Sequence, residues 1–135
     1  KKNPAVQAAF TNSDEDGGLD GACYYSRICV KTENADQYAS GDTYSIDNIK
    51  GKSFSFVSAT STSGFAIPSS SIVSHFGLES SDQLLEDGTF FSSVMFGDSH
   101  QGSAVNLLSG NADAAAFDDI DVDMYFDLVS GELTP

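Results

Sequence analysis

The sequence predicts a single α/β domain, a three-layer sandwich built on a mainly parallel β-sheet. Two observations lead to this class. Segments typical of strands alternate with segments typical of amphipathic helices, in the order strand, helix, strand, helix, strand. The chain has 135 residues, 40% of them hydrophobic, which suits one compact domain around one buried core. We therefore treat residues 1–135 as one folded unit.

The first predicted strand covers residues 22–31, after a loop-like stretch rich in Gly, Asp and Asn at residues 11–21. Both cysteines of the chain, Cys23 and Cys29, fall in this strand. At strand rise they lie about 20 Å apart, whereas a disulfide needs Cα atoms within about 7 Å. We expect both to be unpaired, buried small hydrophobes.

A strand followed by a helix forms the middle of the chain. Residues 45–51 predict a short helical turn, and residues 53–58 (SFSFVS) predict the second strand. This strand runs into residues 59–64 (ATSTSG), and an amphipathic helix follows that ends near Gly77. Because Pro68 cannot donate a backbone hydrogen bond, we expect the first turn of this helix to be loose.

The last predicted elements repeat the same order. Residues 90–96 predict a strand and residues 99–109 a helix, with Gly110 at the position of a C-terminal glycine cap. The nearly continuous apolar run at residues 113–117 is typical of a strand buried on both faces. The acidic stretch at residues 118–127 opens another helix or loop.

The charge distribution restricts what the chain can bind. A formal net charge of −14 argues against nucleic acid and against anionic membrane surfaces as partners. The last basic side chain is Lys52, and residues 53–135 contain 12 Asp or Glu residues but no Lys or Arg. An anion bound by this part of the chain must therefore be held by neutral donors or by a histidine.

The termini carry no targeting pattern. No apolar run of about 18 residues is present, so we expect no membrane span. A charged start followed by a short apolar stretch is also missing, so we expect no signal peptide. The start at Lys1 has the character of an interior point of a longer chain, so we expect a fragment from which export and anchoring sequences have been removed.

Three junctions between a predicted strand and a following helix can hold a ligand: residues 58–64, 97–99 and 117–119. In open parallel sheets, ligands bind where strands end and helices begin. The first junction contains Ser61-Thr62-Ser63, whose hydroxyls add to the unpaired N–H groups of a helix N-terminus. Such a turn suits a tetrahedral oxyanion. Plain helix capping accounts for the same residue types, and spacing alone does not separate the two.

Residues 49–68 (IKGKSFSFVSATSTSGFAIP) resemble the phosphate/phosphite/phosphonate-binding proteins of ABC transporters. The family pattern is a Leu- or Ile-Lys-Gly-Lys start, a Phe-rich strand, Ser-Thr-Ser-Gly, an aromatic or aliphatic pair and Pro. Three further pieces are similar to the family in the same order: Tyr24–Ser26, Ser99-His100 and residues 113–116. The resemblance covers residues 20 to about 120.

The resemblance implies an extracytoplasmic solute-binding protein with a type II periplasmic-binding-protein-like fold. Two α/β lobes of such a protein close on the ligand like a clamshell, and this chain is similar to the second lobe only. The implied partners are a small phosphorus oxyanion, the missing first lobe and an ABC permease. The implied location is the periplasm or, for a lipoprotein, the cell surface. Ligand capture for import involves no bond chemistry, so we expect neither enzyme activity nor a cofactor.

Position by position, the resemblance also implies a set of ligand-binding residues. These are Tyr24, Ser61, Thr62, Ser63, His100, Asp118 and Asp119. The hydroxyl-bearing turn would hold the oxyanion through hydroxyl and backbone N–H groups, and the histidine would donate to the same group. The tyrosine would line the cleft near the hinge. One of the two aspartates would hold the ammonium of an aminophosphonate, and the dense acidic run leaves open which one.

Two other functions fit the sequence less well. Gly97–His100 resembles the Gly-Asp-Ser block of an SGNH-like hydrolase, with Ser99 as nucleophile. A catalytic triad needs a base and an orienting acid from separate places, and no histidine follows His100. A domain that keeps the fold but serves interaction or regulation without a ligand is the remaining alternative.

The acidic run does not predict a metal site. Asp119, Asp121 and Asp123 match the first ligand positions of a calcium loop. Met124 stands where such a loop needs glycine and Ser130 where it needs glutamate, so we expect no EF-hand and no metal. His75 is expected to cover the end of its own helix.

Overall fold

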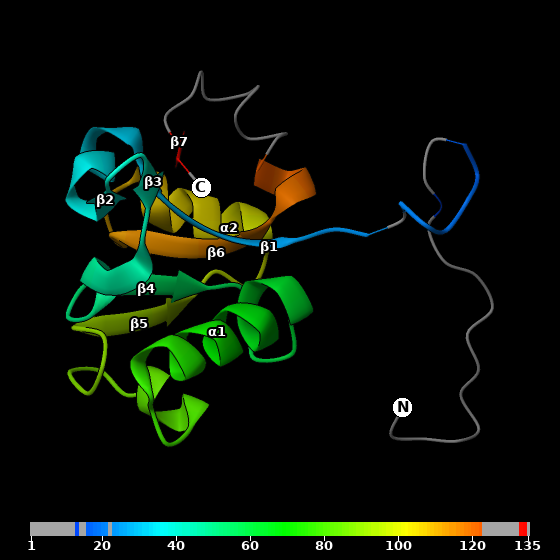
Figure 1. Cartoon of the computed structure of the whole chain (residues 1–135). Helices are drawn as coiled ribbons and strands as arrows, with labels where there is room; N and C mark the ends of the chain where they lie inside the picture. The colour runs from blue at the N-terminus through cyan, green and yellow to red at the C-terminus, as the bar shows by residue number, and fades with distance from the viewer. Residues whose placement is uncertain (1–12, 14–15, 22, 123–132, 135) are drawn as a thin grey trace, which may run out of the picture.

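The computed structural model describes residues 13, 16–21, 23–122 and 133–134 of the chain (Figure 1). Within these residues a five-stranded sheet has the order β5-β4-β6-β1-β7, with α1 on one face and α2 on the other. The predicted three-layer α/β architecture is confirmed. No helix among the described residues is long and apolar enough to cross a bilayer.

The sheet is accompanied by helices and one small hairpin. The strands of the sheet are β1 (Ser26–Lys31), β4 (Ser53–Phe56), β5 (Ser93–Phe96), β6 (Ala114–Asp118) and β7 (Leu133–Thr134). The main helices are α1 (Ile67–Phe76) and α2 (His100–Leu108). The hairpin strands are β2 (Ala39–Ser40) and β3 (Thr43–Tyr44). The short helical segments are η1 (Thr32–Tyr38), η2 (Ile46–Ile49), the π-helical turn η3 (Thr62–Ala66) and η4 (Ser81–Leu84).

The strand directions bring several chain segments to one edge of the sheet. The central strand β4 pairs in parallel with β5 and β6, with Phe54 opposite Val94 and Ala114. Strand β1 runs antiparallel to β6, with Ser26 opposite Asp118. The carboxyl ends of β4, β5 and β6 therefore share an edge with the start of β1, and this edge carries the predicted site.

Successive side chains of β4 point to opposite faces of the sheet, one toward the core under α1 and the next toward the core under α2. Phe54 and Phe56 are fully buried on the α1 face, where the Phe54 ring stacks on Phe91 at 4.7 Å between centroids. Burial of each such side chain contributes about 1.5–3 kcal/mol. Ser55 points to the α2 face and hydrogen-bonds Ser103 of α2 at 3.3 Å. Both serines are fully buried and paired, so a polar contact helps to fix α2 on the sheet.

Strand β6 has the burial that its apolar run predicts. Residues 114–117 are fully buried. Ala114 and Ala116 belong to the core under α1, whereas Ala115 and Phe117 belong to the core under α2. The expected strand buried on both faces is confirmed.

The first strand begins later than predicted, at Ser26 rather than at residue 22, which lies outside the described residues. Before Ser26 the chain still contacts the residue after β6, because the Tyr25 N–H donates to Asp119 Oδ1 at 2.8 Å and the Asp119 N–H donates to the Tyr25 carbonyl at 2.9 Å. Cys23 lies before this contact and is exposed, so the expectation that it is buried was wrong. Cys29 is buried as expected, and burial raises the pKa of its thiol to about 12. Neither cysteine forms a disulfide.

The strand predicted at residues 90–96 is shorter in the structure, because Phe90 and Phe91 turn into the core before β5 starts. Their carbonyls accept from the N–H groups of Gly51 and Gly88, which hold turns rather than a strand ladder. Residues 119–122 are helical, while the remainder of the acidic stretch lies outside the described residues.

Helix α1 has the predicted character at both ends. The π-helical turn η3 precedes it, so the entry is loose, as the position of Pro68 predicts. The helix ends at Phe76, and Gly77 follows with a φ of 64°. Helix α2 likewise ends just before Gly110, whose φ is 79°.

Candidate functional site

The turn between β4 and α1 is fixed by one cap and one close contact. Ser61 precedes η3, and its Oγ accepts a hydrogen bond from the Gly64 N–H at 3.0 Å. A Cβ on Gly64 would lie 2.3 Å from Val57 Cγ2, so the turn packs on β4 only because residue 64 has no side chain. Ser61 is therefore a helix cap, as the capping interpretation predicts.

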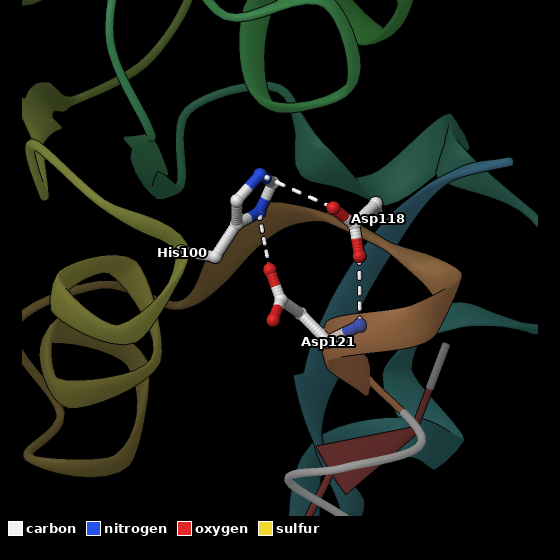
Figure 2. Close-up of side chains that lie close together, drawn as sticks. All are labelled: His100, Asp118 and Asp121. Carbon is white, nitrogen blue, oxygen red and sulfur yellow. Dashed lines mark hydrogen bonds and ion pairs between the residues drawn. The ribbon is translucent and has the colours of Figure 1, made fainter. Parts of the chain in front are cut away.

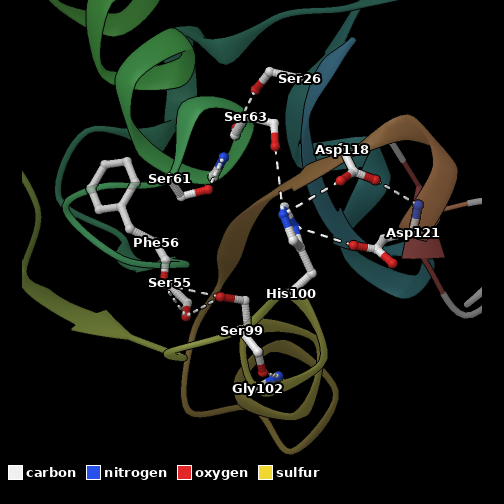
Figure 3. Close-up of polar contacts among 12 residues, drawn as sticks. Ser26, Ser55, Phe56, Ser61, Ser63, Ser99, His100, Gly102, Asp118 and Asp121 are labelled. Carbon is white, nitrogen blue, oxygen red and sulfur yellow. Dashed lines mark hydrogen bonds and ion pairs between the residues drawn. The ribbon is translucent and has the colours of Figure 1, made fainter. Parts of the chain in front are cut away.

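The next two residues differ from the cap. Thr62 is exposed, whereas Ser63 is 5% exposed and its hydroxyl points toward His100, at the start of α2 (Figure 3). Ser63 is held by the Ser26 hydroxyl, which donates to its carbonyl at 2.6 Å. Both residues lie in the first turn of η3, where helical N–H groups lack acceptors within the helix. The turn thus presents hydroxyl and backbone donors at the sheet edge.

The turn between β5 and α2 places His100 at the same edge. Ser99 caps α2, with its Oγ accepting from the Gly102 N–H at 2.9 Å. A Cβ on Gly102 would lie 1.9 Å from the Gly97 carbonyl oxygen, so the first turn of α2 rests directly on the end of β5. His100 then extends to 3.5 Å from the Ser63 hydroxyl through its Nε2. Among the described residues no histidine hydrogen-bonds the Ser99 hydroxyl, as the nucleophile of a hydrolase triad would require.

Two carboxylates, those of Asp118 and Asp121, also lie beside His100 (Figure 2). Its Nε2 is 3.4 Å from Asp118 Oδ2, and its Nδ1 is 3.7 Å from Asp121 Oδ2. The Asp121 N–H donates to Asp118 Oδ1 at 2.7 Å, which fixes the Asp118 carboxylate. Burial, and next the charge of Asp118, raise the pKa of the Asp121 carboxyl. These side chains are between 18% and 26% exposed, so this cluster is largely enclosed.

The remaining predicted residues are placed differently. The Asp119 carboxylate accepts from the Tyr25 N–H and anchors the chain where it enters β1. Of the two adjacent aspartates, Asp118 is therefore the one that contacts His100. Tyr24 is 51% exposed just before β1, and no described polar contact joins it to the other predicted residues. Its role at a hinge stays a prediction.

Sequence reasoning missed Asp121 as a member of this cluster. The acidic run after β6 was compared with a calcium loop, whereas the structure uses it as a helical turn. In such a turn, residues three apart lie on the same side, so Asp121 follows Asp118 toward His100. The available signal was the Asp-x-x-Asp spacing directly after a buried strand.

The family of the chain follows from a sequence comparison. The family described as the periplasmic phosphonate substrate-binding proteins of ABC transporters matches residues 1–130. The chain belongs to this family. Members of the phosphonate-binding family are substrate-binding proteins rather than enzymes, which agrees with the expected class and opposes the hydrolase alternative. No curated protein sequence matches the chain.

A solved structure supports the fold of this family member. The chain is similar to a binding protein component of an ABC phosphonate transporter from Pseudomonas aeruginosa, with a TM-score of 0.64 and 16% sequence identity. The match covers 92% of this chain but 37% of the other. This chain thus spans little more than a third of the length of that protein.

Proposed function

We propose that this lobe binds a phosphorus oxyanion, with phosphonate favoured over phosphite and phosphate, through Ser61–Ser63 and His100. One observation carries the proposal: the hydroxyl-bearing turn before α1 and the histidine that starts α2 come from separate junctions and meet at 3.5 Å. Their hydroxyl, N–H and imidazole groups are donors of the kind that anions bind at helix N-termini. No Lys or Arg follows Lys52, so these neutral donors are what this part of the chain offers.

The carboxylate of Asp118 beside His100 suggests a preference among phosphonates. Asp118 lies 3.4 Å from the imidazole, so an oxyanion on the donor side would have a carboxylate close by. A ligand that also carries an ammonium group would offset this repulsion, because opposite charges at about 4 Å attract. We therefore infer that an aminophosphonate such as 2-aminoethylphosphonate fits better than a phosphonate with an apolar substituent.

The same proposal includes the rest of a transport system. Because the chain covers 37% of its structural neighbour, a first lobe would supply the other side of the cleft and close over the ligand. The loaded protein would deliver its ligand to an ABC permease from the periplasm, or from the cell surface if it is a lipoprotein. With half of the contacts, this lobe alone should bind no tighter than about millimolar, near 4 kcal/mol.

The proposal is tested by removing one donor in a protein that carries both lobes. Thr62→Ala deletes an exposed hydroxyl that is not the helix cap. Hydrogen bonds to charged groups contribute about 1.5–3 kcal/mol, so affinity for methylphosphonate in calorimetry should fall about ten- to a hundredfold. Stability should stay within about 0.5 kcal/mol, as for most surface substitutions.

Thr60→Ala is the matched control, since Thr60 is also exposed and its hydroxyl pairs with Ser58 at 3.3 Å. It should leave affinity unchanged. A lower melting temperature with unchanged affinity in Thr62→Ala would assign the turn to structure alone. A two-lobe protein that binds no phosphorus oxyanion at all would favour the ligand-free interaction domain.

A further inference from the structure

The cluster formed by His100, Asp118 and Asp121 has the composition of a metal site. We propose that these three side chains bind a divalent transition-metal ion, for which Zn²⁺ is the best match. One donor atom from each residue lies within 4.8 Å of the other two. The residues come from the start of α2, the end of β6 and the helical turn after it, so the tertiary fold brings them together.

The spacing is close to what coordination needs. A tetrahedral zinc ion with bonds of about 2.0–2.1 Å keeps its donors about 3.3 Å apart. The Nδ1 of His100 and Oδ2 of Asp121 are 3.7 Å apart. Asp118 Oδ2 lies 3.4 Å from the other ring nitrogen, Nε2, so an ion held by Nδ1 requires this carboxylate to turn toward it.

The surroundings orient these donors and leave their charge uncompensated. The Asp121 N–H donates to Asp118 Oδ1, which leaves Asp118 Oδ2 beside His100, 3.4 Å from Nε2. Outer partners of this kind commonly fix metal ligands. In the described part of the chain no Lys or Arg forms an ion pair with either carboxylate. Two carboxylates thus face a single imidazole, and a divalent cation would balance them.

A second, independent feature points to a missing partner. His100 Nδ1 is a buried atom without a hydrogen-bond partner among the described residues. The 3.7 Å to Asp121 is too long for a hydrogen bond. Buried polar atoms are almost always paired, with protein, water or an ion. An ion between the imidazole and Asp121 would give this nitrogen the partner that it lacks.

The donor set also selects the type of metal. Imidazole suits zinc and other late transition metals, whereas Mg²⁺ prefers oxygen ligands and retains its waters. Three protein ligands leave one position of a tetrahedral ion for water or for an oxygen of another ligand. The metal site shares His100 and Asp118 with the proposed ligand site, and the Ser63 hydroxyl lies 3.5 Å from the same imidazole.

Calorimetric titration of Zn²⁺ into the EDTA-stripped 135-residue chain tests the inference. We expect one ion per chain, and no comparable binding of Mg²⁺. Loss of even an outer-shell partner typically costs about 10–100-fold in metal affinity. His100→Ala and the isosteric Asp121→Asn should therefore each weaken Zn²⁺ binding at least about tenfold. Asp42→Asn, an exposed acid in the β2–β3 turn, is the charge-matched control and should have no effect.

Three outcomes would overturn the metal site: no one-to-one binding, equal binding of Mg²⁺, or affinity that neither substitution changes. The last would show that the acidic surface collects zinc without a defined site. Circular dichroism checks the fold of each variant. If His100→Ala does not fold, the zinc affinity of Asp121→Asn tests the metal site on its own. Because the methylphosphonate titrations with Thr62→Ala are done in EDTA, failure of the metal site and failure of the oxyanion site are separate results.

Discussion

The two histidines of the chain lie beside aspartates in very different surroundings. His75, in the last turn of α1, pairs with Asp47 at 2.6 Å on the surface. His100, the first residue of α2, is four-fifths buried between Asp118 and Asp121. An exposed pair of the first kind contributes little to stability and connects α1 to η2. The enclosed cluster has an excess of negative charge and an unpartnered nitrogen, which are features of a binding site.

The first prediction compares two glycine substitutions, each in the helix of one histidine or at its end, by their effect on the free energy of unfolding. Gly102→Ala forces a Cβ against the Gly97 carbonyl beneath His100, where backbone cannot yield. Overpacking costs about 1–3 kcal/mol and occasionally more, and we expect a loss at the upper end in urea unfolding. Gly77→Ala, at the end of the helix of His75, meets no atom within 4 Å and strains only the backbone. It should cost about 1 kcal/mol.

Equal losses in the two glycine variants would contradict this expectation. They would show that the contact between β5 and α2 is soft, and that His100 is not held in place by it. In that case the geometry of the cluster around His100 would need another support.

The second prediction compares the acids beside the two histidines in ligand binding. In a two-lobe protein, Asp118→Asn should weaken 2-aminoethylphosphonate about ten- to a hundredfold, because a charged hydrogen bond of about 1.5–3 kcal/mol is lost. Methylphosphonate should bind equally well or better, since a negative charge leaves the site. Asp47→Asn should change neither affinity. Calorimetry in EDTA measures all four, and an equal effect of Asp118→Asn on both ligands would remove Asp118 from the ammonium site.

The third and smallest effects concern pH. The hydrogen bond from His75 lowers the pKa of Asp47, so the folded state holds fewer protons there. This stabilisation is present above the unfolded pKa of about 4 and is lost as pH falls through the folded pKa. Asp47→Asn should therefore reduce stability at pH 7, and the difference should vanish in acid.

Asp121 should show the opposite sign. Burial and the charge of Asp118 raise its pKa, so the folded state binds this proton more readily. The resulting stability is present below the unfolded pKa and is lost as pH rises through the folded value. Asp121→Asn should therefore be slightly more stable than the wild type at pH 7, with the gain shrinking in acid. Urea unfolding in EDTA at several pH values measures both slopes, and slopes of the same sign would contradict the contrast.

Local patterns predicted most of the fold. The alternation at residues 53–58 identified β4, and the apolar run at residues 113–117 identified a strand buried on both faces. Pro68 and Gly77 marked the two ends of α1. These features depend on neighbours in the sequence, so a single chain is enough to recognise them.

Features that depend on distant partners could not be predicted in the same way. A strand pattern does not state its direction, so the antiparallel pairing of β1 with β6 was missed. Strand β1 starts only at Ser26, so Cys23 lies outside the sheet and is exposed. The approach of Asp121 to His100 likewise depends on how the chain turns after β6. The candidate site was therefore predicted as separate junctions, and its acidic half only in part.

The most direct test uses the fact that the chain has only two histidines. The 135-residue chain with ¹⁵N-labelled imidazoles is titrated with methylphosphonate into the millimolar range and followed by NMR, with sodium chloride of equal ionic strength as control. The account predicts that the ring nitrogens of His100 shift and saturate, while those of His75 stay unchanged. Equal shifts at both histidines, or a shift at His75 alone, would contradict the assignment of the oxyanion site to His100.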